Sequence, residues 1–170
     1  RMVRVVQTSA VVRLSAADFW ALRLDSNWDR FCASAEGCTF SLLSLVSTPS
    51  PDGEMVAIET QVSAEKSPLP SAIQTLMGAK DFAFSSKARW NTERHDRLHC
   101  ATFESSPRIM SNRVQLRGQS WLEPAPDGAT DSCTVVYRVE IEVKMPALGS
   151  LLEAGLERRL RDSYARMPEL

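Results

Sequence analysis

The chain has 170 residues, of which 44% are apolar and 24% are charged, and its formal net charge is −1. This length and composition predict one globular domain, over residues 1–170, with a substantial core. A net charge this close to zero excludes a general attraction to nucleic acid, and no apolar run approaches the ~18 residues of a membrane span.

The cysteines and the first residue bear on where the protein works. The four cysteines, Cys32, Cys38, Cys100 and Cys133, have neither CxxC nor zinc-module spacing. A domain of this size does not need disulfides, so we expect free thiols in a reducing, intracellular compartment, either cytoplasmic or organellar. Because the chain starts with Arg1 rather than Met, we expect a targeting peptide or another segment to be missing from it.

The N-terminal region predicts a strand followed by two helices. Residues 3–14 are rich in β-branched side chains and read as a strand. The segment Ser15-Ala-Ala-Asp18 resembles a capping box, with Asp in place of Glu, and predicts the start of a helix. A second, short helix is predicted over residues 26–32, with Ser26 or Asn27 as its N-cap.

The middle of the chain predicts consecutive strands joined by short turns. A short helix is expected over residues 72–77, before Gly78. The strands are expected at residues 38–48, 54–64, 81–94, 98–105, 112–122 and 132–144.

The last forty residues carry the clearest pattern. In the final strand, alternate residues from Cys133 to Val143 are apolar and the others are mostly polar, with Val136 as the exception. Pro146 suits the first position of a helix, because its missing N–H needs no partner there. Leucines then recur at helical spacing as far as Leu160, which predicts a long amphipathic helix packed on the sheet.

The predicted order of elements, β-α-α-β-β-β-β-β-β-α, describes an α+β domain with about seven antiparallel strands. This order resembles the helix-grip fold of the START-like superfamily, which includes polyketide cyclases and lipid-transfer domains. The stretch Val143-Lys-Met-Pro-Ala-Leu-Gly149, followed by Leu151-Leu-Glu153, is similar to the V-x-[VM]-P-x-x-G-x-x-[LI]-E junction of small START-like proteins. The resemblance covers nearly the whole chain and does not resolve a subfamily. It implies a curved sheet wrapped around the C-terminal helix, with an apolar cavity between them.

The resemblance also implies which side chains would line that cavity, namely the inward residues of the long strands and of the last helix. These ligand-binding candidates are Phe82, Phe84, Ala88, Trp90, Val114, Leu116, Gly118, Tyr137, Val139, Ile141, Leu152, Leu156 and Leu160. The alternative is that they fill a packed core, as most apolar stripes do. Polar groups that could orient a ligand oxygen are Thr60, Ser86, Ser120 and Tyr137, whereas Arg89, Arg117 and Arg138 have the opposite parity and are expected to face water.

Few residues indicate chemistry. His95 and His99 flank a predicted turn, so we expect them at a solvated hairpin tip rather than in a metal site or a catalytic triad. The chain contains no phosphate-binding, dinucleotide-binding, serine-hydrolase or zinc-protease motif. We therefore expect no metal and no cofactor, and we assign no catalytic residue.

The arginines of the last helix raise the question of membrane binding. Arg158, Arg159, Arg161 and Arg166 alternate with acidic residues, so we expect a solvated helix face and at most transient membrane contact.

Three hypotheses for function follow. The first is binding, and in its fuller form transport, of a hydrophobic, lipid-like small molecule without catalysis. The second is an enzyme of the cyclase or hydratase type, which would require two or more ionisable side chains pointing into the cavity. The third is a module that binds an unidentified protein through exposed apolar residues such as Trp28, Trp121 and Leu42–Leu43.

Overall fold

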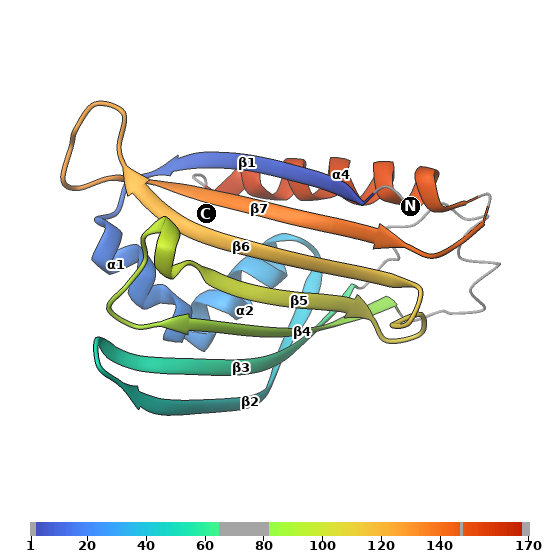
Figure 1. The fold of residues 1–170 in the computed structure, drawn as a ribbon, viewed down its shortest axis with the longest axis horizontal. Helices are drawn as coiled ribbons and strands as arrows, with labels where there is room; N and C mark the ends of the chain where they lie inside the picture. The colour runs from blue at the N-terminus through green and yellow to red at the C-terminus, as the bar shows by residue number, and fades with distance from the viewer. Residues whose placement is uncertain (1–2, 65–81, 147, 168–170) are drawn as a thin grey trace.

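A seven-stranded antiparallel sheet with helices on one side makes up the computed structural model, which describes residues 3–64, 82–146 and 148–167. The strand order is β1-β7-β6-β5-β4-β3-β2, so only the first strand is out of sequence order (Figure 1). The elements are β1 (Arg4–Val12), α1 (Ala16–Ala21), the 3-10 helix η1 (Leu22–Leu24), α2 (Ser26–Ala35), β2 (Cys38–Ser50), β3 (Gly53–Ala64), β4 (Phe82–Asn91), the 3-10 helix η2 (Arg97–His99), β5 (Ala101–Pro107), β6 (Val114–Pro124), β7 (Cys133–Val143) and α4 (Gly149–Arg166).

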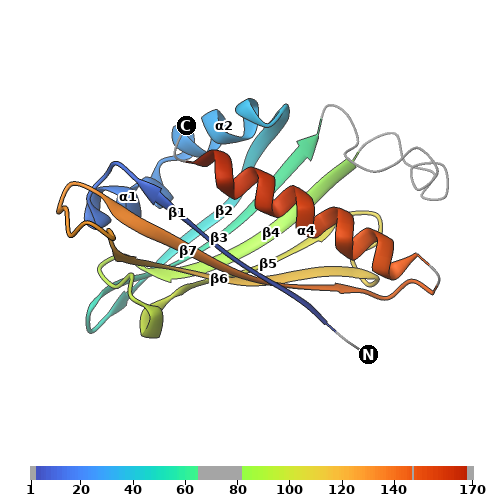
Figure 2. The same cartoon turned by 90° about the horizontal axis from the view of Figure 1, so that it is seen from above.

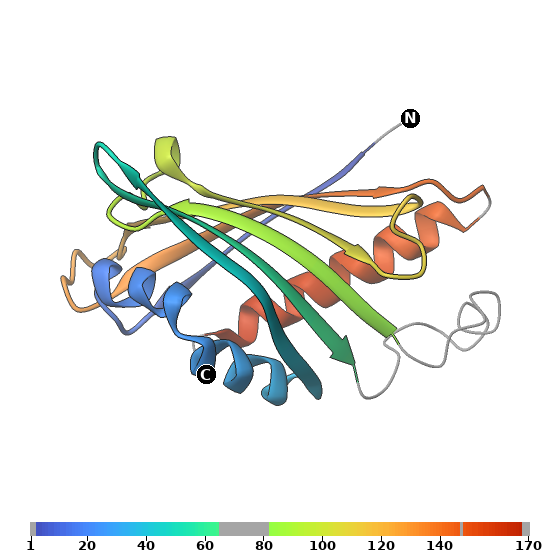
Figure 3. The same ribbon diagram turned by 90° about the horizontal axis from the view of Figure 1, so that it is seen from below.

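The predicted α+β helix-grip architecture and its order of elements are confirmed. Figure 2 shows α4 crossing one side of the sheet, and α2 lies on that same side. Figure 3 shows the strands bending around the side that carries these helices. We call this side the inner face and the opposite side the outer face.

Strand alternation places the apolar stripe of β7 on the inner face, as predicted. Val139 and Ile141 are fully buried. They pair with Gly118 and Leu116 of β6, and these two positions also face inward. Because β7 lies between β1 and β6, it is covered on both edges as well as by α4.

Val136, the exception to the alternation, has a partner on the outer face. It pairs with Trp121, which is only 3% exposed, and the guanidinium of Arg97 lies 5.6 Å from the Trp121 ring. The prediction that Trp121 is exposed is therefore wrong. The other residues of the interaction hypothesis differ: Leu43 is 58% exposed on the edge strand β2, while Trp28 is half-buried and stacks on Phe31.

The helix caps confirm one prediction and correct another. The Ser15 hydroxyl accepts a hydrogen bond from the backbone N–H of Asp18 at 3.1 Å, so the predicted cap of α1 is present. The N-cap of α2 is Asp25, not Ser26 or Asn27, and α2 runs three residues beyond the predicted end. Asp25 keeps an extended backbone, and its carboxylate accepts from the N–H of Asn27 at 2.8 Å. An acidic cap also complements the positive end of the helix dipole.

The junction between β7 and α4 explains the motif noted in the sequence. The helix begins at Gly149, not at Pro146, because Pro146 belongs to a turn in which the Gly149 N–H donates to the Met145 carbonyl at 2.9 Å. A Cβ atom at position 149 would lie 3.2 Å from the carbonyl oxygen of Val143. The glycine therefore lets α4 start in close contact with the end of the sheet.

Other boundaries moved by a few residues. The strand predicted over 81–94 is shorter, and the first hairpin, β2–β3, is longer than expected and turns at Pro51 and Asp52. A bulge between Leu42 and Ser44 interrupts its register. The helix predicted over 72–77 lies outside the described residues.

Two core clusters hold the layers together. The first packs α1 against the sheet and includes Trp20, Trp90 and Val135, with Tyr137 and Met167 at its edge. The second packs the start of α4 against β1, β6 and β7, and consists of Val6, Val114, Leu116, Val139, Ile141, Val143 and Leu152. These clusters leave the space between α2, the end of α4 and the inner face for the cavities described next.

Candidate functional site

A cavity of about 430 Å³ lies between the inner face of the sheet and the helices α2 and α4. We call it the apolar chamber. Its wall is mostly carbon, with a few polar groups contributed by the helices. The lining residues are Asp29, Cys32, Ala33, Glu36, Cys38, Phe40, Val62, Ala64, Phe84, Ser105, Leu116, Leu156, Arg159, Leu160 and Ser163.

The structure divides the thirteen predicted ligand-binding residues. Phe84, Leu116, Leu156 and Leu160 line the apolar chamber, and Tyr137 lines a neighbouring recess. Their contact with a ligand remains a prediction. The remaining eight include Phe82, whose side chain lies outside the described residues. The positions of the other seven favour the alternative, that these residues fill a packed core. Trp90, Val114, Val139, Ile141 and Leu152 are in the packed clusters, Ala88 packs against the first cluster, and Gly118 lies beneath the Phe103 ring.

A second cavity of about 200 Å³ adjoins the chamber at the C-terminal end of α4. We call it the aromatic recess. It shares the lining residues Asp29, Cys32, Glu36 and Ser163 with the chamber, so the two spaces are neighbours along α2. Its lining residues are Phe19, Leu22, Arg23, Trp28, Asp29, Cys32, Glu36, Tyr137, Ser163, Tyr164 and Met167.

Arg23, from the 3-10 helix η1, brings a charge into the aromatic recess. Its guanidinium lies 4.2 Å from the Trp20 ring and donates to the Ser120 hydroxyl at 2.5 Å. Its Nε is buried and has no hydrogen-bond partner among the described residues. Burial lowers the pKa of Arg23, because desolvation disfavours the charged form.

Sequence reasoning missed Arg23. The residue follows a short helix in the stretch Trp20-Ala-Leu-Arg-Leu24, where nothing distinguishes it from a solvated arginine. Ser120, named above as a group that could orient a ligand oxygen, is 1% exposed, and its hydroxyl accepts a hydrogen bond from this guanidinium.

Two tyrosines form one wall of the recess. The rings of Tyr137 on β7 and Tyr164 on α4 stack with centroids 4.0 Å apart and planes 8° apart. The Tyr137 hydroxyl lies 3.8 Å from the Met167 sulfur. Burial raises the pKa of both tyrosines, so both hydroxyls keep their protons at neutral pH and remain hydrogen-bond donors.

Two further ionisable groups lie where the chamber and the recess meet. Burial raises the pKa of Asp29 to about 6, although Arg23 acts in the opposite direction. Burial also raises the pKa of Cys32 to about 11, so its thiol is not a thiolate nucleophile at neutral pH. The site thus holds a permanent cation, an acid that titrates near neutrality and two neutral phenols.

The shifted Asp29 predicts a pH dependence of stability. Because its pKa in the folded chain lies above the ordinary value of 3.8, the folded state binds the proton more tightly, and stability falls as pH rises from about 4 to about 6. We expect Asp29→Asn to remove this loss and to stabilise the protein at pH 7 by roughly 1 kcal/mol, a value discounted for the partial exposure of the carboxylate. Urea unfolding of the wild type and of Asp29→Asn at pH 4 and pH 7 measures this difference in the free energy of unfolding. Asp162→Asn, at an exposed position, is the control. An equal pH dependence in wild type and Asp29→Asn would contradict the shift.

Ion pairs join the two helices that cover the cavities. Glu36, at the end of α2, contacts the guanidinium of Arg166 at 2.6 Å and that of Arg159 at 3.7 Å. Arg161 pairs with Glu157 at 2.9 Å, and Arg4 of β1 contacts the same carboxylate at 2.7 Å. Arg159 and Arg166 therefore link α4 to the end of α2, whereas the Arg161–Glu157 pair lies within α4.

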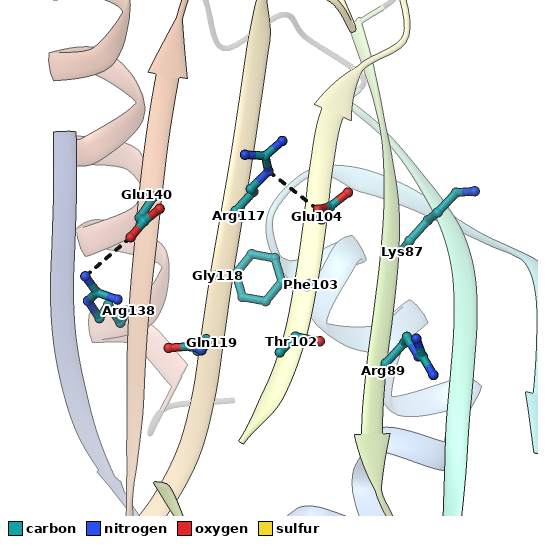
Figure 4. A pocket seen from close by; sticks show the side chains of 10 residues that line it. All are labelled: Lys87, Arg89, Thr102, Phe103, Glu104, Arg117, Gly118, Gln119, Arg138 and Glu140. Carbon is teal, nitrogen blue, oxygen red and sulfur yellow. Dashed lines mark ion pairs between the residues drawn. The ribbon is translucent and has the colours of Figure 1, made fainter. Parts of the chain in front are cut away.

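The outer face carries an open depression of about 430 Å³, shown in Figure 4. Arg89, Arg117 and Arg138 line it, as their parity predicted, and Gly118 and Phe103 belong to its lining. Arg117 contacts Glu104 at 3.5 Å, and Arg138 contacts Glu140 at 3.3 Å. Apart from Arg89, its charged side chains form ion pairs on a solvated surface, so we place the candidate site on the inner face.

The remaining reactive side chains do not form a site in the described part of the chain. Within residues 3–64, 82–146 and 148–167 no three His, Cys, Asp or Glu residues are grouped to hold a metal ion, and the four cysteines are thiols. His95 is half-buried rather than fully solvated, because its ring packs edge-on against Trp20 at 5.8 Å. His99 is exposed and lies 2.9 Å from the Asp96 carboxylate. None of the described helices is long and apolar enough to cross a membrane.

Solved structures with the same architecture confirm the helix-grip fold. The Zhui aromatase/cyclase from Streptomyces sp. R1128 has a TM-score of 0.60 and 10% identity, with 99% of this chain and 94% of that chain covered. Ara h 8.0201 has a TM-score of 0.56 and 11% identity, with coverage of 96% and 93%. TTHA0849 from Thermus thermophilus has a TM-score of 0.54 and 12% identity, with coverage of 94% and 88%. At these identities the similarity is one of fold.

Sequence comparison assigns the chain to a family. A search of curated proteins found no match. The model of the family described as "Protein of unknown function (DUF2505)" matches residues 7–170, and the chain belongs to this family.

Proposed function

We propose that the protein binds a hydrophobic small molecule in the apolar chamber. The observation that carries this proposal is the pair of apolar walls facing each other across about 430 Å³, with Phe40 and Phe84 on the sheet side and Leu156 and Leu160 on the helix side. The volume falls within the range of ~300–1,000 Å³ that is usual for small-molecule sites.

The energetics favour an occupant. Protein interiors are normally close-packed, and apolar side chains that line an unfilled space lose dispersion contacts on that side. A ligand that covers them removes apolar surface from water, at about 25 cal/mol per Å². Because the chamber offers mainly carbon to its contents, we infer that the ligand is lipid-like and that the protein carries it.

Filling the chamber tests this proposal. Ser105 of β5 lines the chamber, whereas Thr102 of the same strand lines the outer depression. We expect Ser105→Phe to weaken binding of the neutral fluorescent probe N-phenyl-1-naphthylamine at least tenfold, because the ring occupies the space of the probe. Thr102→Phe is the matched control and should bind the probe as wild type does. Failure of the wild type to bind the probe, or equal binding by both variants, would contradict the proposal.

The recess supports a second candidate function, an enzyme of the cyclase or hydratase type. Arg23, Asp29, Tyr137 and Tyr164 all line the recess, which meets the requirement for two or more ionisable side chains at the cavity. Arg23 could stabilise a developing oxyanion, and Asp29 could transfer a proton near neutral pH. Incubation with a linear poly-β-keto thioester, followed by mass spectrometry, distinguishes the two functions. Cyclised product that is lost in Tyr137→Phe would favour the enzyme.

A further inference from the structure

We propose that the aromatic recess binds the anionic end of an amphipathic ligand, with Arg23 as the counter-ion and the apolar body of the ligand in the chamber. This inference rests on the proposed function and specifies its ligand class: a carboxylate or a similar oxyanion on an apolar chain or ring.

The first argument is that the Arg23 guanidinium has unused hydrogen-bonding capacity. An arginine has five N–H donors in a planar fork. In the described residues, one hydrogen bond of Arg23 is present, to the neutral Ser120 hydroxyl, while its Nε has no acceptor. Arg23 lines the recess, so an acceptor placed there can reach this side chain; because protein atoms cover Nε itself, we expect the acceptor to bind the terminal N–H groups.

The second argument concerns how the guanidinium is held. Trp20 lies 4.2 Å and Trp90 lies 5.9 Å from its carbon atom, measured to the ring centroids. Aromatic faces attract a cation and fix its plane, but they provide no lone pair for an N–H donor. Arg23 is thus pre-positioned for a ligand rather than satisfied by the protein.

The third argument is charge balance. No carboxylate of the described residues lies within ion-pair distance of Arg23. Of the two acids that line the recess, Glu36 is engaged by Arg159 and Arg166, and Asp29 makes no ion pair with Arg23. Asp29 attracts Arg23 only from beyond ion-pair distance, so the guanidinium has no directly contacting carboxylate, and an oxyanion that binds it in the bidentate manner lowers the cost of its desolvation. The protonated hydroxyls of Tyr137 and Tyr164, which also line the recess, can donate to the same oxyanion.

The fourth argument links the anion to an apolar body. The recess and the chamber share Asp29, Cys32, Glu36 and Ser163 as wall residues, and we infer that one molecule passing these side chains can extend from Arg23 to the leucines of α4. A small inorganic anion would fill the recess and leave the chamber empty. An amphipathic anion satisfies both the charge and the apolar wall.

The test compares two ligands that differ at the head group. Decanoate and 1-decanol each compete with N-phenyl-1-naphthylamine at pH 7.5, and inorganic phosphate is the head-group control. We expect decanoate to displace the probe at a concentration at least tenfold lower than decanol does, because hydrogen bonds to a charged group are strong enough to change an affinity tenfold. Phosphate at equal concentration should leave the probe bound.

Variants locate the effect. In Arg23→Met, decanoate should displace the probe only at the concentration that decanol requires, and the concentration for decanol should not change. Arg23→Lys keeps the charge and should retain part of the preference for decanoate. Arg89→Met, which removes an arginine from the outer face, should behave as wild type. Circular dichroism checks that each variant is folded, and Arg23→Lys against wild type decides the question if Arg23→Met does not fold.

The possible failures are distinguishable. Equal displacement by decanoate and decanol in the wild type overturns this inference, while probe binding leaves the proposed function standing. If Arg159→Met loses the preference for decanoate while Arg23→Met keeps it, the anion lies at the chamber wall. That result overturns the assignment to Arg23. If phosphate competes as strongly as decanoate, the claim that the ligand is amphipathic is overturned. If the probe and both decyl compounds all fail to bind, the proposed function itself fails.

Discussion

Replacing Ile141 by alanine is expected to lower the free energy of unfolding by about 3 kcal/mol. Ile141 is fully buried in β7, between β1 and β6, and packs in the second core cluster. Removing its side chain deletes apolar contacts and leaves a cavity that the surrounding strands cannot close, because their backbone hydrogen bonds fix their spacing. Urea unfolding followed by circular dichroism measures the change.

The informative control is Leu160→Ala in α4. Leu160 is half-buried and lines the apolar chamber, so its truncation should cost less stability but should weaken binding of N-phenyl-1-naphthylamine. Ile141→Ala should show the opposite pattern, a large loss of stability with unchanged affinity for the probe. A loss below about 1 kcal/mol in Ile141→Ala, or a loss of probe affinity in it, would mean that Ile141 belongs to the ligand wall.

Replacing Gly118 by alanine is expected to cost about 1–3 kcal/mol, although alanine is the smallest possible addition. A Cβ atom at this position would overlap the ring of Phe103, its partner across β5 and β6. The Phe103 ring is half-buried and packs against the second core cluster, so it must leave its place to admit a methyl group.

A double-mutant cycle isolates this contact. In a Phe103→Leu background, Gly118→Ala should cost clearly less than in the wild type, because the smaller side chain does not cover position 118. Urea unfolding of the four proteins provides the coupling energy. Equal costs in the two backgrounds would show that the glycine is required for its backbone rather than for the close approach of the ring.

Sequence patterns sufficed for the architecture but not for the division between core and cavity. Val139 and Leu156 belong to equally apolar stripes, yet Val139 is fully buried and Leu156 lines the chamber. Periodicity reports the face on which a side chain lies, whereas a cavity depends on the distance between layers. That distance is short where Gly149 meets Val143, and the chamber lies further along, where α2 and the second half of α4 face the sheet.

Arg23 shows the same limit for a single residue. Its surroundings come from three elements that are remote in the sequence: Trp20 of α1, Trp90 of β4 and Ser120 of β6. A local pattern of residues does not encode such a convergence, and a lone arginine after a short helix is ordinary on a surface. Only packing of η1 onto the inner face turns it into a partly buried cation between two tryptophan rings.

The sequence by itself determined the antiparallel sheet, the inward stripe of β7 and the long terminal helix, because alternation and helical spacing are local properties that each segment carries alone. The tertiary structure decided which apolar residues became core, where the apolar chamber remained, and that Arg23 would stand at its end. Those outcomes depend on how closely layers approach and on which distant side chains meet, and both are set by the packing of the whole chain.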